Sequence, residues 1–85
     1  MRITKTTLED LVNDLNYLLY PNSVINQIGW FVLDINQSGY RLCRVINSGG
    51  GQRDLTPREN GREIFAYISG IINGIRIAQA EIIDV

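Results

Sequence analysis

The segment from Ser48 to Gly61, SGGGQRDLTPRENG, constrains the fold of this chain more than any other stretch. Its three consecutive glycines interrupt regular structure. Thr56, Pro57 and Glu59 then match the residue preferences of the N-cap, N1 and N3 positions at the start of a helix. The segment therefore predicts a boundary, with a sheet before it and a helix that Thr56 caps and that begins at Pro57.

A long apolar stripe follows this boundary. Its members recur at the three- and four-residue intervals of one helix face, at Ile64, Phe65, Ile68, Ile71, Ile72, Ile75 and Ala78. This spacing predicts a helix that continues to about Gln79. The last six residues, AEIIDV, leave three alternatives open, because they suit a longer helix, an edge strand or a loosely packed tail.

A row of small residues runs along the same predicted helix. Ala66, Gly70, Gly74 and Ala78 recur every four residues, and such a row lets another backbone approach closely. The favoured interpretation is close packing against the chain's own sheet or first helix. A homodimer through this row is the alternative.

The N-terminal part of the chain predicts a second helix. Thr6 and Glu9 have capping-box spacing, with Thr7 and Asp10 as an alternative cap, so the helix is expected to start near Leu8. One apolar stripe follows, made of Leu8, Leu11, Val12, Leu15, Leu18 and Leu19, and Pro21 ends the helix. Polar residues outside the stripe, Asn16 among them, are expected to face water.

The residues between the two helices predict a hairpin. IGWFVLDI at 28–35 and YRLCRVIN at 40–47 are rich in β-branched and aromatic residues, and NQSG at 36–39 supplies the turn. Both faces of the first strand are largely apolar, which favours a central or largely covered strand. QRDL at 52–55 is a candidate third strand. The predicted fold is a single α+β domain over residues 1–85, α-β-β-(β)-α, with a small antiparallel sheet packed against two helices.

Composition excludes several kinds of chemistry. The chain has no histidine and a single cysteine, Cys43, so a disulfide framework and the usual zinc ligands are absent. Cys43 lies in the middle of a predicted strand, where a thiol is ordinarily a small buried side chain. We therefore expect a protein that is not an enzyme and has no metal or cofactor. No apolar run reaches the roughly 18 residues of a membrane span, so the protein is expected to be soluble and cytoplasmic.

The charges are unevenly distributed. The whole chain has a net charge of −1, but residues 41–62 contain five arginines and two acids and carry +3. Arg53, Arg58 and Arg62 surround the predicted helix start, where cations oppose the helix dipole. Such arginines favour an anion or an acidic partner at this position. The alternative is neutralisation by neighbouring acids as ordinary surface pairs.

Two functional hypotheses follow. The first is a non-enzymatic binding protein that contacts another protein through an exposed sheet face and the arginine-bearing helix start. The second is a module that binds a nucleotide or single-stranded nucleic acid, because Trp30, Tyr40 and Arg41 around the hairpin suit base stacking. The three glycines do not favour a phosphate site, since no P-loop lysine follows the last of them, and they are expected to form a turn.

The motifs GYRLCRVINSGGG at 39–51 and TPRENGREIFAYISGIINGI at 56–75 resemble a loose family of small uncharacterised proteins from tailed phages and prophages. In that family a Leu-Asn pair near the end of the first helix, here Leu15 and Asn16, precedes a G-Y-x-L strand, a G-G-G turn and a P-R-x-x-x-R-E helix start. The family has no established activity, so the resemblance transfers no site residue. It implies a phage or prophage origin, an accessory role inside the host cell, and a host or phage protein as the partner.

Overall fold

The computed structural model describes residues 2–22 and 27–83. It contains two helices and three strands in the order α1 (Lys5–Leu19), β1 (Phe31–Asn36), β2 (Gly39–Val45), β3 (Gln52–Asp54) and α2 (Gly61–Ile83). The strands form one antiparallel sheet in the order β1-β2-β3. This confirms the predicted α+β fold, and the candidate third strand is present.

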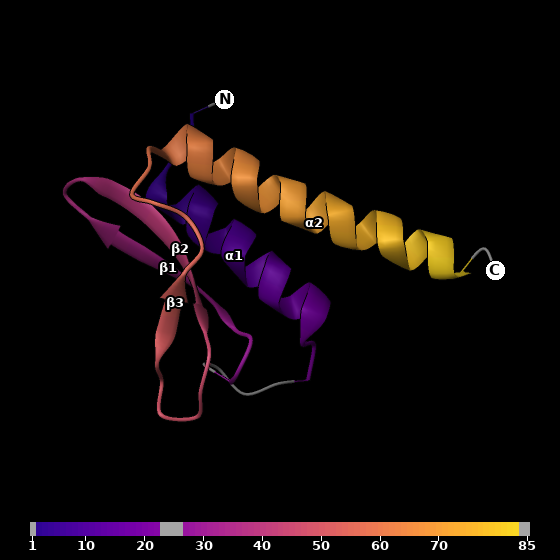
Figure 1. The fold of residues 1–85 in the computed structure, drawn as a ribbon. Coiled ribbons are helices and arrows are strands. Elements are labelled where there is room, and N and C mark those ends of the chain that lie inside the picture. The colour runs from indigo at the N-terminus through magenta and orange to yellow at the C-terminus, as the bar shows by residue number, and fades with distance from the viewer. Residues whose placement is uncertain (1, 23–26, 84–85) are drawn as a thin grey trace.

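The two helices lie side by side against one face of the sheet. Figure 1 shows that both helices begin at the same end of the molecule and run in the same direction, with α2 continuing past the end of α1. The core between the helices and the sheet consists of Leu8, Val12, Leu15, Phe31, Leu42, Ile64, Ile68 and Ile72. Leu8, Val12 and Leu15 come from the predicted apolar stripe of the first helix, and Ile64, Ile68 and Ile72 come from that of the second.

Helix α1 begins earlier than its capping-box signature predicts. Thr4 is the N-cap, and its hydroxyl accepts a hydrogen bond from the Thr7 backbone N–H at 3.2 Å. The Thr4 backbone N–H donates in return to the Thr7 hydroxyl at 3.3 Å. Threonine thus fills the position usually given to Glu or Gln, so the predicted cap at Thr6 is wrong. The helix ends at Leu19, before Pro21, as predicted.

Strand β1 is an edge strand, and β2 is the central one. Of the two predicted alternatives, the central strand is therefore wrong, whereas a strand covered on one face agrees with the core position of Phe31. The helix-facing positions Phe31, Leu33 and Ile35 of β1 lie opposite Arg44, Leu42 and Tyr40 of β2. Phe31 belongs to the core and Leu33 packs against it, which explains their apolar character. The hairpin turn is formed as predicted, with Gly39 at a φ of +128° that other residues rarely adopt.

Helix α2 begins at Gly61, four residues later than predicted. Asn60 caps it, because its side-chain oxygen accepts a hydrogen bond from the Glu63 backbone N–H at 3.0 Å. Thr56 instead is buried and accepts from the Leu42 backbone N–H at 3.1 Å. The segment around Thr56 follows β2, since Tyr40 and Glu59 exchange two backbone hydrogen bonds of 2.8 Å.

This pairing explains the delayed helix start. The backbone N–H and C=O groups of β2 that point away from β1 would otherwise be buried without partners. An unpaired buried peptide group costs about as much free energy as a lost hydrogen bond, roughly 1–3 kcal/mol. The free energy gained by hydrogen bonding several such groups exceeds the preference of Thr56 and Pro57 for a helix start. The prediction of Thr56 as N-cap is therefore wrong for a tertiary reason.

The three glycines form a turn between β2 and β3, as predicted. The Asn47 side-chain oxygen accepts hydrogen bonds from the backbone N–H groups of Gly49 at 3.0 Å and Gly51 at 2.9 Å. Gly50 between them has a φ of +85°. The Asn47 side chain thus stabilises the turn by hydrogen bonds to its backbone.

The row of small residues on α2 faces outward. Ala66, Gly70, Gly74 and Ala78 are all exposed. A Cβ atom added at Gly70 or Gly74 would meet no atom of the described residues within 4 Å. The interpretation as close packing against the sheet or α1 is therefore wrong.

Candidate functional site

The structure separates the three arginines of the predicted cluster. Arg58 lies before α2 and forms an ion pair with Asp34, with 2.7 Å between Nη2 and Oδ2. Its Nη1 also donates to the backbone oxygens of Asp34 at 3.0 Å and Gly39 at 3.4 Å. Arg58 thus clamps the end of the β1-β2 hairpin and is largely occupied by internal contacts.

Two other arginines are also engaged within the sheet. Arg41 pairs with Asp54, with 3.3 Å between Nη1 and Oδ2. Arg44 donates from Nε to the Gly29 backbone oxygen at 2.9 Å, and its guanidinium lies over the Phe31 ring, 4.8 Å from the centroid. These contacts give both side chains a structural role.

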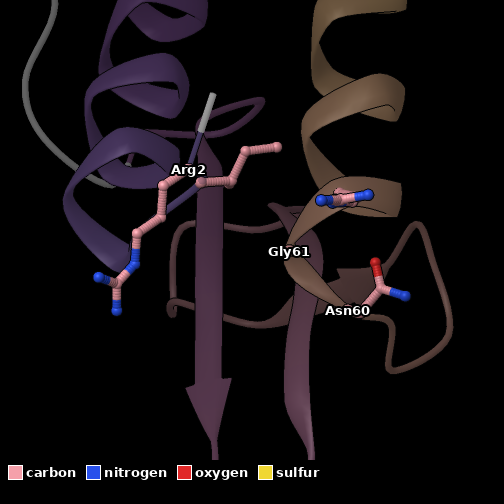
Figure 2. Close-up of a pocket in the computed structure, with 5 residues that line it drawn as sticks. Arg2, Asn60 and Gly61 are labelled. Atoms are coloured by element: carbon pink, nitrogen blue, oxygen red, sulfur yellow. The ribbon is translucent and has the colours of Figure 1, made fainter.

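Arg62 lies in a pocket that the sequence did not suggest. The pocket has a volume of about 400 Å³ and is lined by Arg2, Ile3, Asn60, Gly61 and Arg62. Figure 2 shows that it lies between the lead into α1 and the first turn of α2. Because the two helices are parallel, two positive helix ends and two arginines meet there. Arg2 was not identified from the sequence, because the residues around it do not indicate that the start of α1 lies beside the start of α2.

Two acids beside this pocket moderate its charge. A hydrogen bond with Glu63 raises the pKa of Glu59, and burial and repulsion between the carboxylates act in the same direction. Glu63 is further held by Asn60, whose Nδ2 donates to Oε1 at 2.6 Å. The acidic pair reduces the positive potential of the pocket at neutral pH.

The remaining predicted site residues lie apart from one another. Arg53 is exposed on β3, opposite Arg44. Tyr40 lies on the helix-facing side of β2. Its neighbour Arg41 lies on the opposite face, where it is next to Asp34 in the strand register. Tyr40 and Arg41 therefore do not form one stacking surface.

The outer edge of β1 carries backbone groups that lack partners among the described residues. Val32 and Asp34 form the hydrogen-bonded pairs with Cys43 and Arg41, so the N–H and C=O groups of the alternate residues point away from β2. At Phe31 both groups are bound by Asn16. At Leu33 and Ile35 no described residue binds them, and we name these two positions the open edge.

A groove of about 200 Å³ runs between the open edge and α1. It is lined by Glu9, Val12, Asn13, Asn16, Trp30, Phe31, Val32 and Leu33. Trp30, predicted as a binding residue, therefore lines this groove. Leu33, Ile35 and Asn16 could not be identified as site residues from the sequence, because which strand lies at the edge depends on how the strands are ordered in the sheet.

Cys43 is not suited to nucleophilic chemistry. It is buried, and its Sγ donates to Asp54 Oδ1 at 3.4 Å. Burial and this hydrogen bond raise the pKa of the Cys43 thiol to about 11. Since the thiolate is the reactive form, the thiol is inert near neutral pH.

Residues 2–22 and 27–83 offer no group of three or more acidic or cysteine side chains arranged to hold a metal ion. Within the same residues, neither helix has the length and apolar character needed to cross a membrane. In comparisons with known proteins, no family model, curated protein or solved structure matches this chain.

Proposed function

We propose that this protein is a small non-enzymatic binding protein that acts through protein–protein contacts. The observation that carries the proposal is the open edge at Leu33 and Ile35, which lies beside the groove along α1. Soluble proteins usually protect an edge strand with lysine, proline, a bulge or a covering element. The sequence of β1, FVLDIN, has neither lysine nor proline. An edge whose outward N–H and C=O groups lack partners among the described residues suits strand addition by a partner.

The proposal also includes the origin and the partner. The sequence resemblance implies a phage or prophage protein that acts in the cytoplasm of the host cell, with a host or phage protein as partner. Arg53 and Arg62 are exposed and offer secondary contacts to an acidic partner surface. A homodimer is the alternative partner.

A pull-down from host lysate tests the proposal with a variant of the open edge. Ile35→Pro removes an outward N–H and no hydrogen bond to β2, so the sheet is expected to tolerate it. Ile35→Val is the matched control, because it keeps the backbone N–H. We expect the wild type and Ile35→Val to capture the same proteins and Ile35→Pro to lose them. Unchanged capture by a folded Ile35→Pro protein, checked by circular dichroism, would refute the role of the open edge.

The pocket between the two helix starts favours a second candidate function, binding of a nucleotide or single-stranded nucleic acid. Arg2 and Arg62 line the pocket together with the first turn of α2. Fluorescence anisotropy with a labelled single-stranded oligonucleotide tests it at several salt concentrations. Arg62→Ala is expected to weaken binding and Arg76→Ala, elsewhere on α2, to leave it unchanged. Absence of binding at low salt would remove this candidate.

A further inference from the structure

The chain contains two Asn-Gly pairs, Asn60–Gly61 and Asn73–Gly74. Such pairs are prone to spontaneous deamidation, because glycine has no Cβ to hinder attack by its backbone nitrogen on the preceding side chain. Both asparagines are exposed to solvent. Water therefore reaches both side chains, and the backbone around each pair decides whether it reacts.

The Asn73–Gly74 pair lies in the middle of α2, which spans Gly61–Ile83. The Gly74 N–H is held by the helical hydrogen bond to the carbonyl oxygen four residues earlier. Ile72, directly before the pair, is buried in the core. Attack by the Gly74 nitrogen requires this part of α2 to open, so the pair is protected in the folded protein.

The Asn60–Gly61 pair lies at the start of α2 (Figure 2). Gly61 is the first residue of the helix, where a backbone N–H has no acceptor within the helix. Among residues 2–22 and 27–83, no group outside the helix accepts a hydrogen bond from the Gly61 N–H. The attacking nitrogen is therefore free, and the first turn of a helix opens at little cost in free energy.

Two hydrogen bonds to Glu63 hold the Asn60 amide in place. Its Nδ2 donates to Glu63 Oε1 at 2.6 Å, and its Oδ1 accepts from the Glu63 backbone N–H at 3.0 Å. Both hydrogen bonds are exposed to solvent. Water can therefore replace them at small net cost when the Asn60 side chain turns toward the Gly61 nitrogen.

We propose that Asn60–Gly61 is a site of spontaneous deamidation, which converts the amide that caps α2 into a carboxylate. The Gly61 nitrogen bonds to Cγ of Asn60, the Cγ–Nδ2 bond breaks, and the proton of the Gly61 N–H leaves with the amide group as ammonia. Water then opens the cyclic imide at either of its carbonyl carbons, which gives an aspartyl or an isoaspartyl residue. The reaction depends on neither proposed function.

Deamidation changes the pocket between the two helix starts, which Asn60 lines together with Arg2 and Arg62. The aspartyl product still caps α2, since aspartate is as good an N-cap residue as asparagine. It lacks the Nδ2 donor to Glu63 and adds a negative charge to a pocket lined by two arginines. The isoaspartyl product also lengthens the backbone by one methylene group at the helix start.

Peptide mapping by mass spectrometry tests the inference on the full chain, incubated in mildly alkaline buffer. Trypsin cuts after Arg58, Arg62 and Arg76, so Asn60 and Asn73 fall in different peptides. In the folded protein the Asn60 amide is expected to be lost at least about tenfold faster than the Asn73 amide. In urea the two amides are expected to react at similar rates. A sample digested without incubation gives the background.

Gly61→Ala tests the role of the attacking nitrogen. A Cβ at position 61 would lie 3.5 Å from the Ile3 side chain and 3.6 Å from the Tyr40 ring, which are ordinary contacts, so the fold is expected to be kept. Circular dichroism checks this. Gly61→Ala is expected to slow the loss at Asn60 to the rate at Asn73, and the matched control Gly74→Ala is expected to leave the Asn60 rate unchanged.

Three results would overturn the inference. Equal loss of both amides from the folded protein would show that the start of α2 gives Asn60 no greater reactivity. An Asn60 amide that reacts in urea but stays intact in the folded protein would show that the cap protects it. An aspartyl product without the isoaspartyl form, or an unchanged rate in Gly61→Ala, would show direct hydrolysis by water instead of attack by the Gly61 nitrogen.

Discussion

Asn16 of α1 binds both outward backbone groups of Phe31 at the start of β1. Its Nδ2 donates to the Phe31 carbonyl oxygen at 2.9 Å, and its Oδ1 accepts from the Phe31 N–H at 2.7 Å. The side-chain amide thus takes the place of a neighbouring strand for one residue. It fixes α1 to β1 and sets one limit of the open edge.

Asn16→Ala is expected to destabilise the protein by about 2–4 kcal/mol, because it leaves a buried N–H and a buried C=O without partners. Asn16 is only 1% exposed, so water cannot replace the amide without rearrangement. Urea unfolding followed by circular dichroism measures the loss. Asn13→Ala, at an exposed position of the same helix, is the control and is expected to change stability by less than about 0.5 kcal/mol. Equal effects of the two substitutions would contradict the structural role of Asn16.

Cys43 is expected to make stability depend on pH in the alkaline range. Burial raises the pKa of its thiol from 9.0 to about 11, so the folded state keeps a proton that the unfolded state loses. The contribution is complete below pH 9 and is lost as the pH rises to 11, by about 2–3 kcal/mol in total. Urea unfolding of the wild type and of Cys43→Val at several pH values measures how the free energy of unfolding depends on pH. Parallel curves for the two proteins between pH 9 and 11 would refute it.

Arg58 and Asp34 are expected to be energetically coupled. A double-mutant cycle with Arg58→Ala and Asp34→Asn should give a coupling energy of about 1 kcal/mol, because the pair is close but Asp34 is partly exposed to solvent. Arg58→Lys is expected to recover little of the loss, since lysine lacks the planar fork that binds the carboxylate and two carbonyl oxygens together. Additive effects of the two substitutions would show that the ion pair contributes nothing.

Two glycines are expected to respond oppositely to alanine. Gly39→Ala should cost about 2–4 kcal/mol, because its φ is positive and the new Cβ would contact the Glu59 carbonyl oxygen. Gly70→Ala should stabilise the protein by about 1 kcal/mol, since the position is helical and open. Thermal unfolding of both variants measures the two shifts. A loss of stability in Gly70→Ala would indicate that another molecule approaches this exposed row in solution.

The order of elements could be predicted because its signals are local. Apolar residues at helical spacing identified both helices, and the turn residues before Gly39 and around Gly50 identified the two strand connections. The face that each helix buries was also predictable from periodicity alone, as the buried Leu8, Leu15 and Ile68 illustrate.

The details that matter for the candidate site depend on distant partners. Asn16 was expected to face water, yet it is buried by its contact with Phe31, 15 residues away. Arg58 was expected on the first turn of α2 and instead binds Asp34, 24 residues away. Neither partner can be read from the sequence around the residue itself.

The sequence by itself determined the two helices, the hairpin and the glycine turn, since each depends on residue spacing and backbone preference within a few positions. Only the tertiary structure decided where α2 begins, which strand lies at the edge and which arginines remain accessible. The physical reason is competition for hydrogen bonds. Leu42 needs an acceptor that Thr56 supplies from 14 residues away, and this requirement outweighs the local preference of Thr56 to cap a helix.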